Sequence, residues 1–190
     1  FGTAPSVAAA RDIRFQRDLW TLIAGLEQPI IVAINGFCMG SGIELSMLCD
    51  IRIASEEAQF GLPEVNLGII PAACGSQTVP RVIRPPWAAE MLLLGNRINA
   101  QEAYRIGLVN CVVPKDELMP TAERLAKEIA GKSPIAVRFA KQAVNRGLDL
   151  TLDQGLELET TLLSLLTTTA DRVEGARAFL EKRQPSFKGR

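Results

Sequence analysis

The sequence contains no histidine among its 190 residues. This absence excludes the Ser-His-Asp and Cys-His arrangements of nucleophilic enzymes, and it disfavours a catalytic zinc site. If the chain performs acid–base chemistry, carboxylates are the side chains left to do it. We therefore expect no metal and look first at the glutamates.

The chain also lacks a net charge, a CxxC pair and a long apolar run. Lys plus Arg and Asp plus Glu number 21 each, so no overall field favours nucleic acid or an anionic membrane. No apolar stretch approaches the roughly 18 residues of a transmembrane helix, which predicts no membrane partner. The four cysteines are far apart and are interpreted as reduced thiols of an intracellular protein: Cys38, Cys49, Cys74 and Cys111.

The beginning of the chain, from Phe1 to Pro5, has neither an initiator Met nor the pattern of a signal peptide. We expect that the sequence begins part-way through a longer protein. Hydrophobic residues make up 47% and charged residues 22%, values typical of one globular domain with an ordinary core.

One stretch, Pro29–Asp50, organises the rest of the chain. Five consecutive apolar residues, Ile30 to Ile34, predict a strand that is covered on both faces, as parallel strands are. The strand should stop at Asn35-Gly36. The glycines around Ser41 then predict a tight turn, and a short buried helix follows from Ile43. The first N–H groups of such a helix lack intrahelical partners, so this turn can bind developing negative charge.

Two carboxylates follow glycine-containing bends. Glu44 lies in the first turn of the predicted helix among apolar neighbours, where it is either a helix cap or a catalyst. Glu64 ends the bend that follows the strand Ile51–Ala54, where it is either a surface residue or part of a cleft. Ligand sites of layered α/β folds gather at the carboxyl ends of parallel strands, so both carboxylates can face one cleft.

Stop and start signals divide the remaining chain mainly into helices. Small residues at 72–77 allow close approach of the backbone, either for helix packing or for a ligand. The apolar residues of the third C-terminal helix exceed what docking on its own domain needs, so it either forms subunit contacts or is buried within the chain. The predicted elements are a helix over 11–27, a helix from Pro86 to Gly95, a helix capped by Asn99 with Glu102 in a capping box, a last strand over Leu108–Val113, and C-terminal helices from Asp116 or Pro120 to Gly131, from Ser133 to Gly147, from Thr151 to Thr167 and from Thr168 to about Arg183.

These motifs, in this order and spacing, resemble the enoyl-CoA hydratase/isomerase (crotonase) family over nearly the whole chain. The resemblance is carried by Ala33–Gly36, Gly40–Leu45, Cys49-Asp50, Ala58–Glu64, Leu67–Pro71, Gly95–Ala103, Gly107–Val109, Asp171–Gly175 and Ala178–Arg183.

The resemblance implies an α/β fold, a spiral of ββα units, here lacking its N-terminal turns, with a C-terminal helical region for trimerisation. It divides the chain into a partial spiral core, 1–113, and a helical region, 114–190, that makes oligomer and CoA contacts. It implies a homotrimer or a dimer of trimers, an acyl-CoA thioester as substrate with no further cofactor, and a cytoplasmic enzyme, with the mitochondrial matrix as the alternative. RNA binding, known for one branch of the family, finds no support in the zero net charge.

For chemistry, the resemblance implies that Glu44 and Glu64 activate the water added by a hydratase, and that the N–H of Ser41 helps to stabilise the enolate. The alternatives are another reaction of the family, namely isomerisation, dehydration or ring-cleaving hydrolysis, or a non-catalytic fragment that folds and oligomerises. The residues expected to bind substrate are Gly40, Gly42, Pro63, Gly68, Pro71, Cys74, Phe179 and Lys182, of which the last two match positions that contact the nucleotide end of CoA.

The sequence departs from the family pattern in three respects. Ser41 replaces a glycine, and a strained backbone there would cost about 1 to 3 kcal/mol. Ala72 and Cys74 also replace glycines, which should narrow the room beside the acyl group. Family members usually carry further residues ahead of the position of Phe1, which include the second oxyanion N–H and much of the adenine pocket. For Lys182, pairing with a phosphate and simple solvation at a helix end both stay open.

Overall fold

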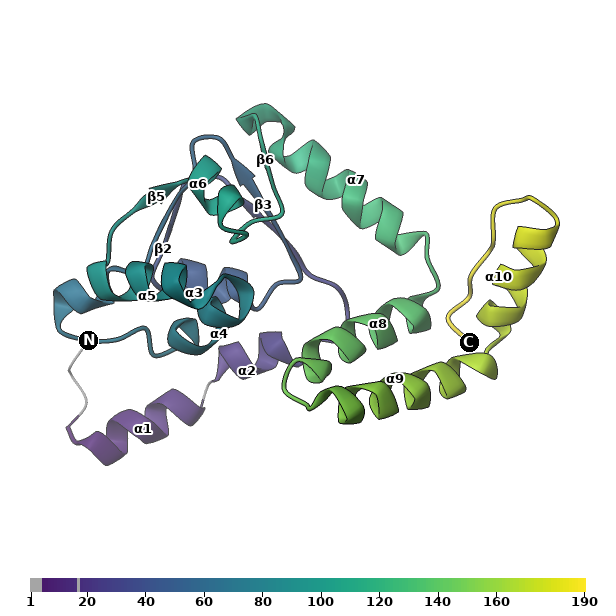
Figure 1. The fold of residues 1–190 in the computed structure, drawn as a ribbon, viewed down its shortest axis with the longest axis horizontal. Coiled ribbons are helices and arrows are strands. Elements are labelled where there is room, and N and C mark those ends of the chain that lie inside the picture. Colours follow the sequence, from purple (N-terminus) through teal and green to yellow (C-terminus); the bar gives the residue numbers. More distant parts are fainter. Residues whose placement is uncertain (1–4, 17) are drawn as a thin grey trace.

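The computed structural model describes residues 5–16 and 18–190. Two small sheets form its centre (Figure 1). The first has the order β1-β3-β6, with parallel strands β1 (Ile31–Ile34), β3 (Ile51–Ser55) and β6 (Cys111–Val113). The second has the order β2-β4-β5, where β2 (Phe37–Met39) runs parallel to β4 (Gln59–Gly61), and β4 runs antiparallel to β5 (Ile98–Asn99). The predicted parallel strand before the glycine turn is confirmed.

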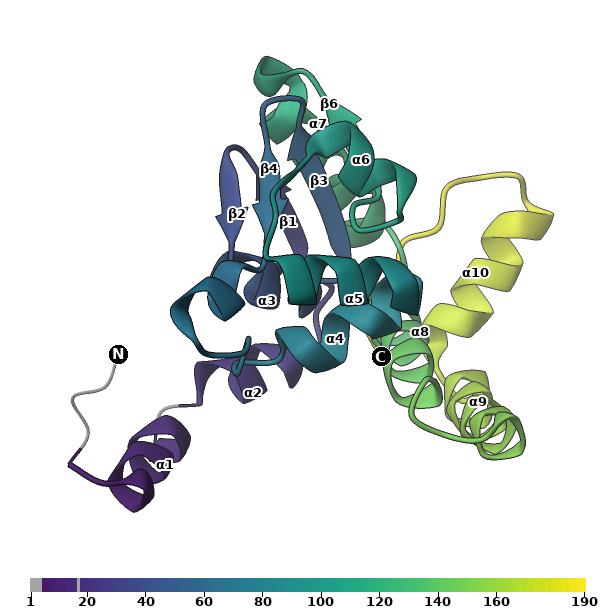
Figure 2. The same ribbon diagram turned by 60° about the vertical axis from the view of Figure 1, so that its left-hand side comes forward.

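Helices surround these sheets, and the last ones extend away from the strands in both views (Figures 1 and 2). Helix α7 packs on β1 and β3, whereas α8 packs chiefly on α9. None of the helices in the described part of the chain is long and apolar enough to cross a bilayer. The helices are α1 (Val7–Gln16), α2 (Leu19–Ala24), α3 (Ser41–Met47), α4 (Gly75–Val82), α5 (Pro85–Leu94), α6 (Ala100–Arg105), α7 (Leu118–Ala130), α8 (Pro134–Gly147), α9 (Leu152–Thr167) and α10 (Ala170–Leu180), with 3-10 turns η1 (Pro63–Leu67) and η2 (Lys115–Glu117).

The core covers both faces of the first sheet. On one side, Ala54 of β3 joins a large cluster that includes Ile43 of α3 and Phe60 of β4. On the other side, Ile53 of the same strand packs with Leu118 and partly buried neighbours beneath α7. Successive residues of a strand point to opposite faces, so a run of apolar residues is what a strand buried on both sides requires.

Several helix signals are confirmed. Pro86 lies in the first turn of α5, which begins one residue earlier than predicted, at Pro85, and Gly95 ends the helix in the left-handed region with φ 64°. Thr151 and Gln154 form the predicted capping box of α9. Cys38 and Cys49 are buried and Cys74 and Cys111 are half-buried, and none of the four forms a disulfide within the described residues. Burial raises the pKa of the Cys38 thiol to about 11, which keeps it protonated.

Other predictions are wrong. The single helix over 11–27 is two helices, because the side chain of Asp18 accepts the Thr21 N–H at 3.2 Å and starts α2 anew; Arg17, between them, lies outside the described residues. Strand β2 was not predicted, since three residues are too few to show a pattern. The last strand is only Cys111–Val113, and Thr169 rather than Thr168 caps α10.

Glu102 does not complete a capping box. Asn99 caps α6 as predicted by accepting the Glu102 N–H at 2.9 Å. The carboxylate of Glu102 binds Arg105 instead, with one bond at 2.7 Å from the Arg105 Nε. The nearby guanidinium is a stronger donor for a carboxylate than a neutral backbone N–H.

Candidate active site

The turn between β2 and α3 is built on Gly40. This residue has φ 52° and ψ −118°, a conformation that side chains rarely adopt, and its N–H donates to the Gly61 carbonyl of β4 at 2.9 Å. A β carbon on Gly40 would lie 2.7 Å from Oε1 of Glu64. Glycine is therefore needed here twice, for the backbone angle and for the space that the Glu64 carboxylate occupies.

Ser41 begins α3 without the strain that a non-glycine residue could have brought. Among the described residues other than glycine, only Lys182 has a positive φ. The serine therefore costs no backbone strain at this position. Its N–H is one of the first helical donors, which have no acceptor within the helix.

Glu44, on the same helix, is 2% exposed and caps a different helix. Its Oε1 accepts the N–H groups of Ala73, Cys74 and Gly75 at 2.8, 2.9 and 2.9 Å, where α4 begins. The sequence suggested a cap of Glu44's own helix as one alternative, but the carboxylate caps α4, a helix distant in sequence. All three bonds go to Oε1, so Oε2 is the oxygen that chemistry at this carboxylate would use.

The small residues at 72–77 serve this contact. A β carbon on Gly75 would lie 2.9 Å from Cβ of Pro71 and 3.0 Å from Cγ of Glu44. The Cys74 thiol is 3.3 Å from the Glu44 carbonyl oxygen, to which it can donate. The backbone therefore approaches the Glu44 side chain closely here, as the small residues allowed.

Glu64 lies in η1, directly after β4 and Pro63. Its Oε2 is buried and has no hydrogen-bond partner within the described residues. Burial without a partner is costly for a carboxylate oxygen, and such groups mark positions where a ligand or water completes the bonding. Gly68 ends η1 in the left-handed region with φ 71°, and its surroundings are exposed.

Glu44 and Glu64 both come from segments that adjoin the turn at Gly40. The backbone N–H of Glu44 donates to the Gly40 carbonyl at 3.1 Å, and the Glu64 carboxylate occupies the space that a β carbon on Gly40 would need. Gly42 and the Ser41 N–H belong to the first turn of α3. The elements around this turn hold these residues of the predicted site: Gly40, Ser41, Gly42, Glu44, Pro63, Glu64, Pro71 and Cys74.

A family model described as enoyl-CoA hydratase/isomerase matches residues 8–190. The chain belongs to the enoyl-CoA hydratase/isomerase family. It is 42% identical to crotonyl-CoA hydratase of Syntrophomonas wolfei, with 96% of this chain and 76% of the relative covered. It is 44% identical to 2,3-dehydroadipyl-CoA hydratase of Escherichia coli, with 96% and 71% covered.

The solved structure of an enoyl-CoA hydratase from Bacillus anthracis superimposes with a TM-score of 0.90 at 45% identity, covering 96% of this chain and 70% of that one. The fold of this enoyl-CoA hydratase/isomerase family member is therefore the crotonase fold, as the resemblance implied. The division of the chain at residue 113 and the roles of the individual site residues stay predictions.

The structure does not bring Phe179 and Lys182 to the other residues of the predicted site. Phe179 is 83% exposed on α10, which lies away from α3 in both views (Figures 1 and 2). Lys182 follows α10 with φ 53°. The N–H groups of Lys182 and Arg183 donate to the carbonyls of Phe179 and Ala178 at 3.3 and 3.0 Å, a Schellman ending that normally places glycine at the position of Lys182.

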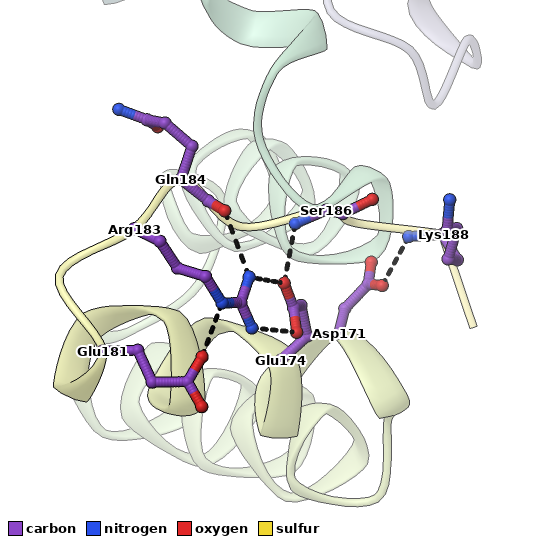
Figure 3. Close-up of polar contacts among 7 residues, drawn as sticks. All are labelled: Asp171, Glu174, Glu181, Arg183, Gln184, Ser186 and Lys188. Atoms are coloured by element: carbon purple, nitrogen blue, oxygen red, sulfur yellow. Dashed lines mark hydrogen bonds and ion pairs between the residues drawn. The ribbon is translucent and has the colours of Figure 1, made fainter.

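A polar clasp, consisting of Glu174, Arg183 and the Ser186 N–H, holds the C-terminal tail against α10 (Figure 3). Arg183 donates to both oxygens of Glu174 at 2.7 and 3.0 Å, and the Ser186 N–H donates at 2.8 Å. These bonds, that of Arg183 above all, lower the pKa of Glu174 to about 2. The clasp fixes the segment that contains Lys182, and sequence reasoning did not identify it.

A second carboxylate fastens the end of the tail. Asp171 is 3% exposed and accepts the Lys188 N–H at 2.7 Å, the Gly189 N–H at 3.0 Å and the Ser133 hydroxyl at 2.8 Å. Burial raises its pKa, but these hydrogen bonds outweigh burial, and the pKa is lowered overall. The tail is therefore tied both to α10 and to the turn before α8.

Proposed function

We propose that this chain adds water across the 2,3 double bond of a 2-enoyl-CoA thioester. The observation that carries the proposal is that the Gly40 turn begins the helix that holds Ser41 and Glu44 and also leaves the space that the Glu64 carboxylate occupies. The named relatives, a crotonyl-CoA hydratase and a 2,3-dehydroadipyl-CoA hydratase, support the same reaction.

In the proposed mechanism the thioester carbonyl oxygen accepts the Ser41 N–H. This donor polarises the carbonyl, makes C3 electrophilic and stabilises the enolate that forms when water attacks. Oε2 of Glu44 and the carboxylate of Glu64 hold the water between them. The oxygen of water bonds to C3, one of its protons passes to a carboxylate, and C2 receives a proton from the pair, which titrates as a coupled unit.

The remaining site residues shape the binding of substrate. Pro71 and the half-buried Cys74 border Glu44, so the cysteine in place of glycine narrows the space for the acyl group. The nucleotide end of CoA would reach Phe179 and Lys182 of a neighbouring chain, because α10, which contains Phe179, lies away from α3 within one chain (Figures 1 and 2). A homotrimer or dimer of trimers, a cytoplasmic location and the need for no cofactor beyond the acyl-CoA belong to this proposal as predictions of the family resemblance.

The experiment is hydration of crotonyl-CoA, followed by loss of the enoyl-thioester absorbance and by the mass of the product. Glu64→Gln should lower the rate at least about a hundredfold if Glu64 transfers a proton. Glu56→Gln, which changes an exposed glutamate in the turn after β3, is the matched control and should match the parent chain.

A product with the same mass as the substrate would show that the reaction is isomerisation and not hydration. Absence of turnover with acyl-CoA bound, as measured by calorimetry, would point to another reaction of the family. Absence of both turnover and binding would leave a module that folds without catalysing the reaction.

A further inference from the structure

Helix α8 spans an open hollow beside the two helices that hold Glu44. The hollow has a volume of about 890 Å³ and is lined by Met47 of α3, Val82 of α4, and Val144 and Leu148 of the α8 segment. Val144 is 62% and Leu148 is 70% exposed. Helix α8 therefore does not pack closely on α3 and α4 through these apolar side chains.

One ion pair ties α8 to the end of α3. The Lys141 Nζ lies 2.9 Å from Oδ2 of Asp50, which follows α3 closely in the chain, and it also donates to the Gln28 carbonyl at 2.8 Å. The same Asp50 oxygen accepts the Ile30 N–H at 2.7 Å, at the start of β1. The Lys141 side chain is only 10% exposed, so this contact is shielded from water and salt.

A second, weaker pair lies just after α8. Asp149, two residues beyond the helix, is 3.6 Å from Arg81, near the end of α4, and both side chains are more than half exposed. An exposed pair at this distance contributes little by itself. Together, the two pairs connect the segment around α8 with the C-terminal ends of α3 and α4.

The connection matters because Glu44 joins the same two helices, from the middle of α3 to the start of α4. Glu44 belongs to α3, and the three N–H groups that bind its Oε1 lie at the start of α4. A small change in the angle between α3 and α4 would lengthen these bonds and displace Oε2. A displacement of about 1 Å can lower a rate a hundredfold.

We propose that α8 holds α3 and α4 in a fixed orientation relative to each other, and we call α8 a strap for this reason. Lys141 is then a positioning residue for Glu44. The structural part of this inference is independent of the reaction. Its kinetic consequence rests on the proposed hydratase function.

Hydrogen exchange of the amides of residues 73–75 tests the strap without any substrate. Lys141→Met should speed their exchange at least about fivefold, because the bonds to Glu44 open more often. Lys141→Arg, which keeps the cation, should stay within about twofold of the parent. Lys132→Met, which changes an exposed lysine shortly before α8, is the matched control and should leave the exchange unchanged.

The double variant Asp50→Asn with Lys141→Met provides a second test of the proposal if Lys141→Met alone does not fold. It leaves no unpaired charge, and the asparagine oxygen can still accept the Ile30 N–H. Its residues 73–75 should also exchange at least about fivefold faster. Exchange within about twofold of the parent in folded Lys141→Met or in the folded double variant would overturn the proposal. Exchange in Lys141→Arg as fast as in Lys141→Met would also overturn it.

Kinetics supply the second arm. With crotonyl-CoA, Lys141→Met should lower kcat about tenfold and leave KM within about twofold, because the change acts on the geometry of Glu44 rather than on substrate contacts. If the parent chain has no hydratase activity, the proposed function is refuted. Hydrogen exchange of residues 73–75 still tests whether α8 acts as a strap, because that experiment uses no substrate. An active parent with an unchanged kcat in Lys141→Met would refute the positioning role.

Discussion

Replacement of Glu44 separates the two roles that its carboxylate combines. Glu44→Ala removes the acceptor of three backbone N–H groups at the start of α4, on a side chain that is only 2% exposed. Buried donors without an acceptor pay their full desolvation cost, and the three losses are not independent. We expect the free energy of unfolding to fall by about 3 to 5 kcal/mol.

Glu44→Gln changes the chemistry more than the structure. The amide oxygen can take the place of Oε1 and accept the same three N–H groups, while the amide nitrogen takes the place of Oε2. The bonds lose their ionic character, which should cost about 1 to 2 kcal/mol of stability. The nitrogen cannot accept a proton from water, so the hydration rate should fall at least about a hundredfold.

Urea unfolding and crotonyl-CoA hydration measure the two effects on the same preparations, under conditions in which both variants are folded. The expected pattern is a large loss of stability only in the alanine variant and a large loss of rate in both. A glutamine variant that hydrates crotonyl-CoA at the parent rate would reduce Glu44 to a cap of α4. An alanine variant as stable as the parent would show that the three bonds contribute little to the fold.

Three further predictions follow from single residues. Gly75→Ala should lower kcat at least about tenfold, because the new β carbon would lie 3.0 Å from Cγ of Glu44. Gly155→Ala is the contrasting variant: its β carbon would meet nothing within 4 Å, so it should stabilise α9 by up to about 1 kcal/mol. Lys182→Gly should raise the free energy of unfolding in urea by about 1 kcal/mol, since glycine suits its φ of 53°; a loss of stability would contradict this. The depressed pKa of Glu174 means that the clasp stabilises the tail above pH 4.5 and is lost as pH falls through about 2, so the NMR signal of the Ser186 amide should titrate near 2 and not near 4.5.

The strand, turn and helix around Gly40 could be predicted because their signals are local. A run of β-branched residues, closely spaced glycines and an apolar helix face each depend on neighbours in sequence. Element β1 and the start of the buried helix α3 follow from them. The C-terminal helices were placed for the same reason, through caps such as Thr151 and stops such as Gly131.

The partners of the functional side chains could not be predicted, because they come from distant segments. Its place in the sequence suggested that Glu44 could cap its own helix. The N–H groups that its carboxylate accepts belong instead to Cys74 and its neighbours, about thirty residues further along the chain. The tie from Lys141 to Asp50 likewise joins segments that no local pattern relates. The split between α1 and α2 was missed because the spacing of apolar residues stays close to helical over 11–27. The cap at Asp18, which starts α2, does not show in that spacing.

The glycines supply the physical link between sequence and site. Each of the two proposed catalytic carboxylates lies where a particular glycine lacks a β carbon. A β carbon on Gly40 would lie 2.7 Å from Oε1 of Glu64, and one on Gly75 would lie 3.2 Å from Oε1 of Glu44. Ser41, in contrast, stands where the family resemblance expects glycine, and its φ is not positive. The glycine-rich turn is thus not uniformly intolerant of side chains. Gly40 has to be glycine because of its positive φ and because of the room that it leaves for the Glu64 carboxylate, whereas Ser41, which has no positive φ, can stand beside it in the same turn.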